Sequence, residues 1–172
     1  MSANGGQPRA IEKLNAARFE HAHLWPHFLP DGSHFVFFVL SASPAATGVY
    51  VGSVDSADYT MLFQSDTGAV YAPTADGSGN RGFLLYIRGR SLMGVGFNAG
   101  RLQLAGDPVM VQDDVGMVAS QSLASVSVSR NAALVYQSVG QATRRLVWMD
   151  RGGKTVSRCP RRGRLGPAAH FT

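Results

Sequence analysis

The sequence predicts an all-β fold: a partial β-propeller of about three four-stranded antiparallel blades, the last one incomplete. The first observation is frequent punctuation, because 20 Gly and 8 Pro in 172 residues suit short strands joined by turns. The second is that strand-length apolar segments recur in the same order with a period in the forties, which is typical of propeller blades. The third is that no segment has the 3.6-residue apolar repeat of an amphipathic helix.

The first blade is predicted over residues 24–65, after a short candidate strand at residues 10–14. Its first two strands flank Asp31 and Gly32, a dipeptide that favours a tight turn because glycine adopts positive φ without steric cost. The second strand is apolar at successive positions, as expected for a strand that is covered on both faces. The four predicted strands are residues 24–29, 34–40, 48–55 and 59–64.

Two more sets of strands follow in the same order and predict a second blade over residues 69–115 and a third over residues 122–157. The turn residues Asp31 and Asp76 lie 45 positions apart, close to the length of one blade. The strands of the second blade are residues 69–74, 83–88, 91–98 and 108–111. Those of the third are residues 122–129, 132–137 and 145–150, with a turn at residues 130–131.

A β-sandwich with a similar number of strands is the alternative architecture. Sandwich strands also alternate between two faces, as Val49 and Val51 alternate with Tyr50, but they need not come in sets of four. The agreement of the repeats in order as well as in spacing favours the propeller. We expect the aromatic residues of the strands to pack mainly in the core between blades. They are Trp25, Phe28, Phe35, Phe37, Tyr50, Phe83, Tyr86, Phe97 and Trp148.

Four segments together resemble one family. Residues 25–35, Trp-Pro-His-Phe-Leu-Pro-Asp-Gly-Ser-His-Phe, resemble the blade start of TolB-like, WD-repeat-like propellers, and residues 48–55 resemble the third strand of that blade. Residues 84–98 look like the following blade, and residues 146–154 are similar to its "L-x-W-x-D-R-x-G-K" segment. The combination is typical of the propeller that follows the kinase domain in many bacterial serine/threonine protein kinases. The resemblance covers roughly residues 5–157 and implies a segment that recognises a protein or a ligand.

The last residues depart from this resemblance. The family would continue into another blade, whereas residues 158–172 have no strand alternation and carry four of the 16 basic residues. We therefore expect a partial propeller over residues 1–157, an irregular basic tail over residues 158–172, and a truncated or frame-shifted C-terminus. Because a blade buries its faces against its neighbours, we also expect exposed blade faces to cause marginal stability or self-association.

The charge distribution argues against nucleic-acid binding. The net charge of +5 divides into +7 over residues 144–172, with eight basic residues and one acid, and −2 over residues 1–143, with eight basic residues and ten acids. A phosphate-binding surface needs clustered cations on a folded scaffold.

The sequence contains no signal-peptide pattern and no apolar run of 18 residues. We expect no membrane insertion by this segment, and an extracytoplasmic or periplasmic location if it belongs to a receptor-like kinase.

Four histidines, His21, His23, His27 and His34, are concentrated early in the chain. His21 and His23 could share one face of a strand and so hold a metal ion. No nearby cysteine and no suitably spaced acid completes a ligand set. We therefore expect structural or solvated roles for these side chains and assign no metal site.

Recognisable catalytic motifs are absent from the sequence. It has no kinase Gly-rich loop, H-R-D or D-F-G motif, and no G-x-S-x-G motif. Residues 152–155, Gly-Gly-Lys-Thr, lack the first glycine of a phosphate loop and are expected to form a hairpin turn. Cys159 has no identifiable base beside it, and the adjacent Asp113 and Asp114 are expected to end a strand. We assign no catalytic or cofactor-binding residue and no cofactor, and we do not expect this segment to be an enzyme.

The function expected from the sequence is therefore recognition of a protein or a ligand by a non-catalytic propeller segment, as the sensor or scaffold part of a bacterial serine/threonine kinase. One alternative is the accessory propeller of a hydrolase of the prolyl-oligopeptidase kind. Another is a degenerate fragment without a function. Propellers bind through their loops and channel mouth, and this expectation rests on analogy between folds.

Overall fold

A computed structural model describes residues 5, 7, 10–11, 13–74, 80–118, 122–138, 147–149 and 155–158. The chain divides into two units, Met1–Val139 and Gly140–Thr172. As expected, the fold is all-β and antiparallel. Within the described residues the helical segments are two single turns of 3₁₀ helix, η1 (Ala16–Arg18) and η2 (Pro44–Ala46), and none of the described helices could cross a membrane.

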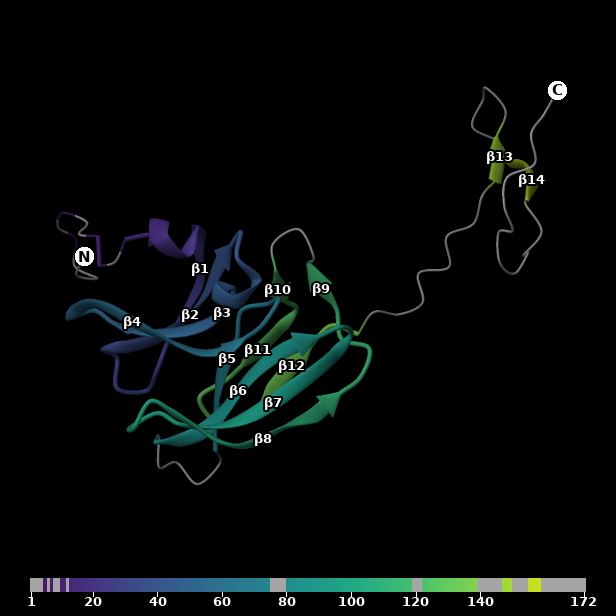
Figure 1. Ribbon diagram of the computed structural model, residues 1–172. Coiled ribbons are helices and arrows are strands. Elements are labelled where there is room, and N and C mark those ends of the chain that lie inside the picture. The colour runs from purple at the N-terminus through teal and green to yellow at the C-terminus, as the bar shows by residue number, and fades with distance from the viewer. Residues whose placement is uncertain are drawn as a thin grey trace. The chain divides into compact units, whose positions relative to one another are not determined.

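The first sheet is a meander in which each strand pairs with the next one along the chain (Figure 1). The predicted turn at Asp31 is confirmed, because its carboxylate accepts hydrogen bonds from the backbone N–H groups of Ser33 and His34 at 3.0 Å each. The strands are β1 (Glu20–Phe28), β2 (His34–Ser41), β3 (Gly48–Ser53) and β4 (Ser56–Gln64).

Strand β1 differs from its prediction at its N-terminal end. It begins at Glu20, four residues before the expected start, because Glu20 pairs with Ser41 of β2. Two register shifts interrupt this pairing, and Trp25 at the second shift has a positive φ of 57°. Gly68 leaves room for this side chain, because a Cβ on Gly68 would lie 3.3 Å from Cβ and Cδ1 of Trp25.

The second sheet repeats the meander of the first. Its last strand is longer than predicted and begins at Gln103, five residues before the expected start. Gly106, with a φ of 77°, and Pro108 lie in the middle of this strand. The strands are β5 (Val70–Pro73), β6 (Arg81–Arg88), β7 (Ser91–Asn98) and β8 (Gln103–Gln112).

One apolar core joins the facing surfaces of the two sheets. The period-two alternation of β3 is confirmed, since Val49 and Val51 enter this shared core while Tyr50 lies on the opposite face. Burial of one such side chain contributes about 1.5–3 kcal/mol, so the shared core accounts for much of the packing between the sheets. Its buried members are Leu29, Val36, Val49, Val51, Ala69, Tyr71, Leu84, Tyr86, Val95, Phe97 and Ala99.

The outer face of the first sheet carries a second core, which is largely aromatic. Phe37 is its centre, with ring centroids of Phe35, Tyr50 and Tyr59 at 5.5, 6.0 and 5.7 Å. Ile11 packs against this core from the N-terminal segment. The prediction of a strand at residues 10–14 is wrong, because the described residues there lie outside any strand.

Two short hairpins cover the other face of the second sheet. Leu85, Ile87 and Leu92 of that sheet form a third core with Val115 and Ala124. The four strands of the hairpins are β9 (Met117–Val118), β10 (Leu123–Ala124), β11 (Val126–Val128) and β12 (Leu134–Tyr136).

The third set of strands differs from the predicted incomplete blade, whose expected strands are residues 122–129, 132–137 and 145–150. In the described residues the third set consists of two-stranded sheets, β9 with β10 and β11 with β12. The strand expected over residues 122–129 is divided at Ser125, whose backbone N–H donates to Gly116 O and whose carbonyl accepts from Gln137 N. The predicted turn after β11 is confirmed, since Ser129 N donates to Ala133 O at 2.9 Å.

The second unit contains one described hairpin. Strands β13 (Val147–Met149) and β14 (Thr155–Arg158) pair antiparallel. This pairing agrees with the hairpin expected around Gly152, Gly153 and Lys154, residues that themselves lie outside the described part of the chain.

The expected burial of the strand aromatics is confirmed for most of them. Phe35, Phe37, Tyr50, Tyr86 and Phe97 are all at most 5% exposed. Phe28 and Phe83 are exceptions, with exposed fractions of 57% and 42%. Trp25 is partly buried, and the side chain of Trp148 lies outside the described part of the chain. Phe28 and Phe83 are thus apolar side chains that the packing of the described residues leaves partly in solvent.

Candidate functional site

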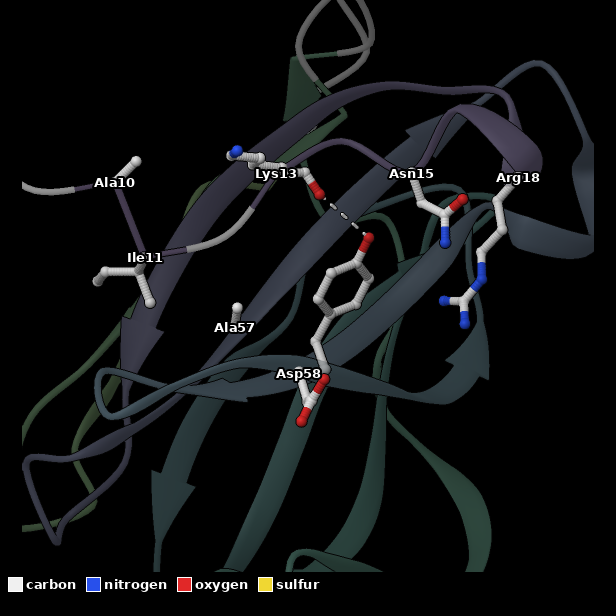
Figure 2. A pocket seen from close by; sticks show the side chains of 8 residues that line it. Ala10, Ile11, Lys13, Asn15, Arg18, Ala57 and Asp58 are labelled. Carbon is white, nitrogen blue, oxygen red and sulfur yellow. Dashed lines mark hydrogen bonds between the residues drawn. The ribbon is translucent and has the colours of Figure 1, made fainter.

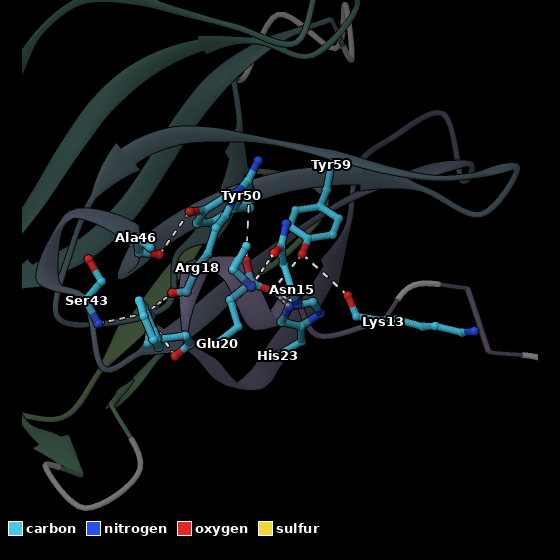
Figure 3. Close-up of polar contacts among 12 residues, drawn as sticks. Lys13, Asn15, Arg18, Glu20, His23, Ser43, Ala46, Tyr50 and Tyr59 are labelled. Carbon is cyan, nitrogen blue, oxygen red and sulfur yellow. Dashed lines mark hydrogen bonds and ion pairs between the residues drawn. The ribbon is translucent and has the colours of Figure 1, made fainter.

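A buried carboxylate is the centre of a connected polar cluster, which we call the Glu20 cluster (Figure 3). Glu20 opens β1 and its side chain has no exposed surface. Its Oε2 atom accepts from the Asn15 backbone N–H at 2.7 Å, from His23 Nε2 at 3.0 Å and from the Tyr59 hydroxyl at 2.6 Å. The His23 bond requires the tautomer that carries a proton on Nε2. The cluster therefore ties the N-terminal segment to β1 and β4.

Opposing effects set the ionisation of Glu20. Burial raises the pKa of a carboxyl group because it disfavours the charged form. The hydrogen bonds from Tyr59, Asn15 and His23 favour the carboxylate and outweigh burial, so the pKa of Glu20 lies below its ordinary value. The group is therefore ionised at neutral pH and acts as an acceptor.

The second oxygen of Glu20 faces an arginine. Oε1 accepts no hydrogen bond from the described residues, and Nη1 of Arg18 lies 4.0 Å away. The guanidinium also lies 5.6 Å from the ring centre of Tyr59, a cation–π distance. Arg18 thus partly compensates the charge of the buried carboxylate and covers the aromatic core.

A cavity of about 620 Å³ lies beside this cluster, between the N-terminal segment and β4 (Figure 2). Its charged lining residues, Lys13, Arg18 and Asp58, have mixed signs. The Tyr59 hydroxyl is 3.4 Å from the Lys13 carbonyl, but its single proton is better placed for Glu20 at 2.6 Å. The cavity lies between β4 and the N-terminal segment, and the hydrogen bonds of Glu20 fix that segment in place. We therefore interpret the Glu20 cluster as a structural clamp.

A second cavity crosses three sheets, and we call it the three-sheet groove. It has a volume of about 660 Å³, within the range of about 300–1,000 Å³ that is usual for ligand sites. The end of β1 and the turn after it, the strand β5, and the β11–β12 hairpin each supply part of its wall. The lining residues are His27, Phe28, Leu29, Pro30, Gly32, Tyr71, Pro73, Thr74, Val128, Ser129 and Arg130.

The polar side chains of the three-sheet groove are defined by the protonation of a histidine and by the hydrogen bonds of two hydroxyl groups. Burial lowers the pKa of His27 below its ordinary value, so its imidazole is neutral near pH 7. The Ser129 hydroxyl hydrogen-bonds with Asn131 Oδ1 of its own turn and accepts from the Ala133 backbone N–H at 3.0 Å. The Thr74 hydroxyl donates to the Arg81 carbonyl at 3.0 Å. These hydroxyls thus bond within the turns that carry them.

The histidines singled out from the sequence lie in different surroundings. His21 is exposed, whereas His23 is packed 5.1 Å from Phe37 between ring centroids. His34 contacts the carboxylate of Asp31 in the β1–β2 turn. Among the described residues, no three His, Cys, Asp or Glu side chains are grouped to hold a metal ion.

The remaining candidates from the sequence are accounted for or lie outside the described part. Asp113 and Asp114 directly follow β8, as expected. The Ser91 hydroxyl, 2.8 Å from Oδ1 of Asp113, and the Asp114 N–H lower the pKa of Asp113, and Asp114 forms an ion pair with Arg90. Cys159 lies outside the described residues.

Sequence reasoning missed both candidate sites. Glu20 and Tyr59 are 39 residues apart, and no motif links them. The groove joins Phe28, Tyr71 and Arg130, which come from three separate sets of strands. The sequence held one usable signal: each of these three residues lies in, or directly after, the first predicted strand of its own set of strands.

Comparisons of the chain with protein-family models, with curated proteins and with solved structures found no match.

Proposed function

We propose that this chain is a non-catalytic β-propeller segment that recognises a protein or a ligand, as the sensor or scaffold part of a bacterial serine/threonine kinase. The observation that carries the proposal is the stacking of two consecutive four-stranded meanders on one shared core. Successive antiparallel blades that bury their faces against each other are what a propeller requires. The propeller and its kinase association also rest on the resemblance of residues 25–35 and 146–154.

The three-sheet groove supports recognition as its use. The first strands of neighbouring propeller blades lie next to the central channel, and β1 and β5, the first strands of their sheets, both line the groove. Its walls combine exposed apolar surface, at Phe28, with a few polar groups, which is the usual composition of a binding site.

The same groove gives little support to catalysis. A nucleophile needs a base within hydrogen-bond reach, and that base needs a third group to orient it. Ser129 is bonded within its own turn, and none of the described residues that line the groove is a carboxylate that could orient His27. Binding without a chemical step is the function that these groups fit best.

Peptide display tests the proposal. The full chain is immobilised and panned against two random peptide libraries, one displayed with free C-termini and one displayed as internal loops. We expect enriched clones from at least one library whose affinity falls at least about tenfold on Phe28→Ala, because that substitution removes apolar groove surface, where about 1.4 kcal/mol corresponds to tenfold.

The matched control is Phe83→Ala, which removes a similarly exposed phenylalanine on β6 outside the groove. Clones selected on the wild-type chain should bind this variant unchanged. If neither library yields enriched clones, or if the enriched clones bind Phe28→Ala as tightly as the wild-type chain, the proposal of recognition through this groove is wrong.

A further inference from the structure

The three-sheet groove carries one positive charge beside apolar walls. Arg130 is exposed and lies in the turn between β11 and β12. Among the described residues that line the groove, Arg130 is the one charged side chain, since His27 is neutral. The groove therefore offers a ligand one cationic contact next to apolar surface.

The turn holds the backbone of Arg130 in a fixed place. Ser129 N donates to Ala133 O at 2.9 Å, and Ala132 N donates to Ser129 O at 3.1 Å. No carboxylate among the described residues lies within 4.0 Å of its guanidinium, since the ion pairs found there involve other cations. The guanidinium is thus free of protein carboxylates in the described part of the chain and can take an external one.

Apolar surface lies within the same groove. Phe28 exposes 57% of its surface, while the buried Tyr71 and Leu29 form the wall behind it. Pro30 and Pro73 extend this wall from the β1–β2 turn and from the end of β5. Such surface gains free energy when an apolar side chain covers it.

We infer that the groove binds the C-terminal end of a partner polypeptide whose last residue is apolar, with the terminal carboxylate on Arg130 and the last side chain against Phe28. This inference rests on the proposed recognition function and names the ligand class of the same site. Arginine presents a planar pair of N–H donors that matches a carboxylate. A phosphate group carries more charge than a single guanidinium balances, so charge complementarity favours the carboxylate.

A titration of the full chain with acetyl-Ala-Ala-Phe, followed by ¹⁵N NMR to millimolar peptide, tests the inference. We expect the backbone amide signals of the groove residues to shift. The same peptide as a C-terminal amide should bind at least about tenfold more weakly, because it loses a charged hydrogen bond. Acetyl-Ala-Ala-Gly, which lacks the apolar side chain, should also bind more weakly, by a similar factor.

The charge of the groove is tested with Arg130→Gln, which should bind the acid and the amide equally. The matched control is Arg101→Gln, an exposed arginine in the β7–β8 turn, which should keep the preference for the acid. Equal binding of acid and amide by the wild-type chain overturns the inference, and so does the absence of groove shifts with the acid. Clones from the internal-loop library that depend on Phe28 would still support the recognition function, so the two failures are distinguishable.

Discussion

The Glu20 carboxylate is the residue on which the packing of the N-terminal segment depends. Its fully buried side chain receives three hydrogen bonds, one of them from the segment itself. A buried charge is stable only when it is paired or hydrogen-bonded. Its donors come from before β1, from β1 and from β4, so its loss affects all three places at once.

We predict that Glu20→Gln lowers the free energy of unfolding by about 1–3 kcal/mol, because charged hydrogen bonds become neutral and one amide group is buried without full pairing. Urea unfolding followed by fluorescence measures the change. The control is Asp58→Asn on β4, an exposed neighbour expected to stay within about 0.5 kcal/mol. Equal effects of the two substitutions would contradict the role of Glu20.

The pH dependence of this effect has a defined sign. The pKa of Glu20 is depressed in the folded state below its ordinary value of 4.5. Its contribution is therefore fully present above that value and is lost as the pH falls through the lower folded pKa. Below that lower pKa, the gap between the wild-type chain and Glu20→Gln should narrow. The pKa of Asp31 is depressed as well, so the difference between the two chains, measured at each pH, isolates Glu20.

At the scale of elements, the close approach of β7 and β8 depends on a glycine. A Cβ on Gly96 would lie 2.3 Å from the Ala105 carbonyl oxygen, closer than atoms can pack. We predict that Gly96→Ala destabilises the chain by about 1–3 kcal/mol, as overpacking does, although alanine is usually the better residue inside a strand. Urea unfolding at equilibrium provides the measurement.

Gly100→Ala, in the turn after β7, is the matched control for this substitution. Its added Cβ would meet Asn80 and Asn98 at an ordinary 3.6 Å, so the change should be within about 0.5 kcal/mol. A neutral Gly96→Ala would mean that β8 can move away from β7 at little cost.

Local sequence patterns predicted the positions and faces of the strands better than they predicted which distant residues each strand contacts. The alternation of Val49, Tyr50 and Val51 assigned the faces of β3 correctly, and the turn at Asp31 is set by neighbours in the chain. The start of β1 was missed because Glu20 reads as a polar loop residue and is buried only by contacts with Tyr59 and other distant groups. The groove was missed for the same reason, since its residues meet only through sheet packing.

At the scale of the whole molecule, the described members of the three apolar cores all lie in the first unit. Their members end at Leu134, before the unit ends at Val139. We predict that a chain truncated after Val139 keeps a cooperative urea transition, with a midpoint close to that of the full chain, because the apolar area that drives folding is retained. The full-length chain, unfolded in parallel, is the control, and a gradual transition of the truncated chain would contradict the prediction.

The interruption of β8 has a consequence for how this protein associates. An outermost strand normally offers its backbone as a template on which further chains can add, the route to fibrils. Gly106 twists β8 out of regular geometry, and Pro108 has no N–H to donate. The outer edge of the second sheet, which β8 forms, is thereby protected from the addition of further chains. This holds even though Val109 and Met110 remain exposed next to the interruption.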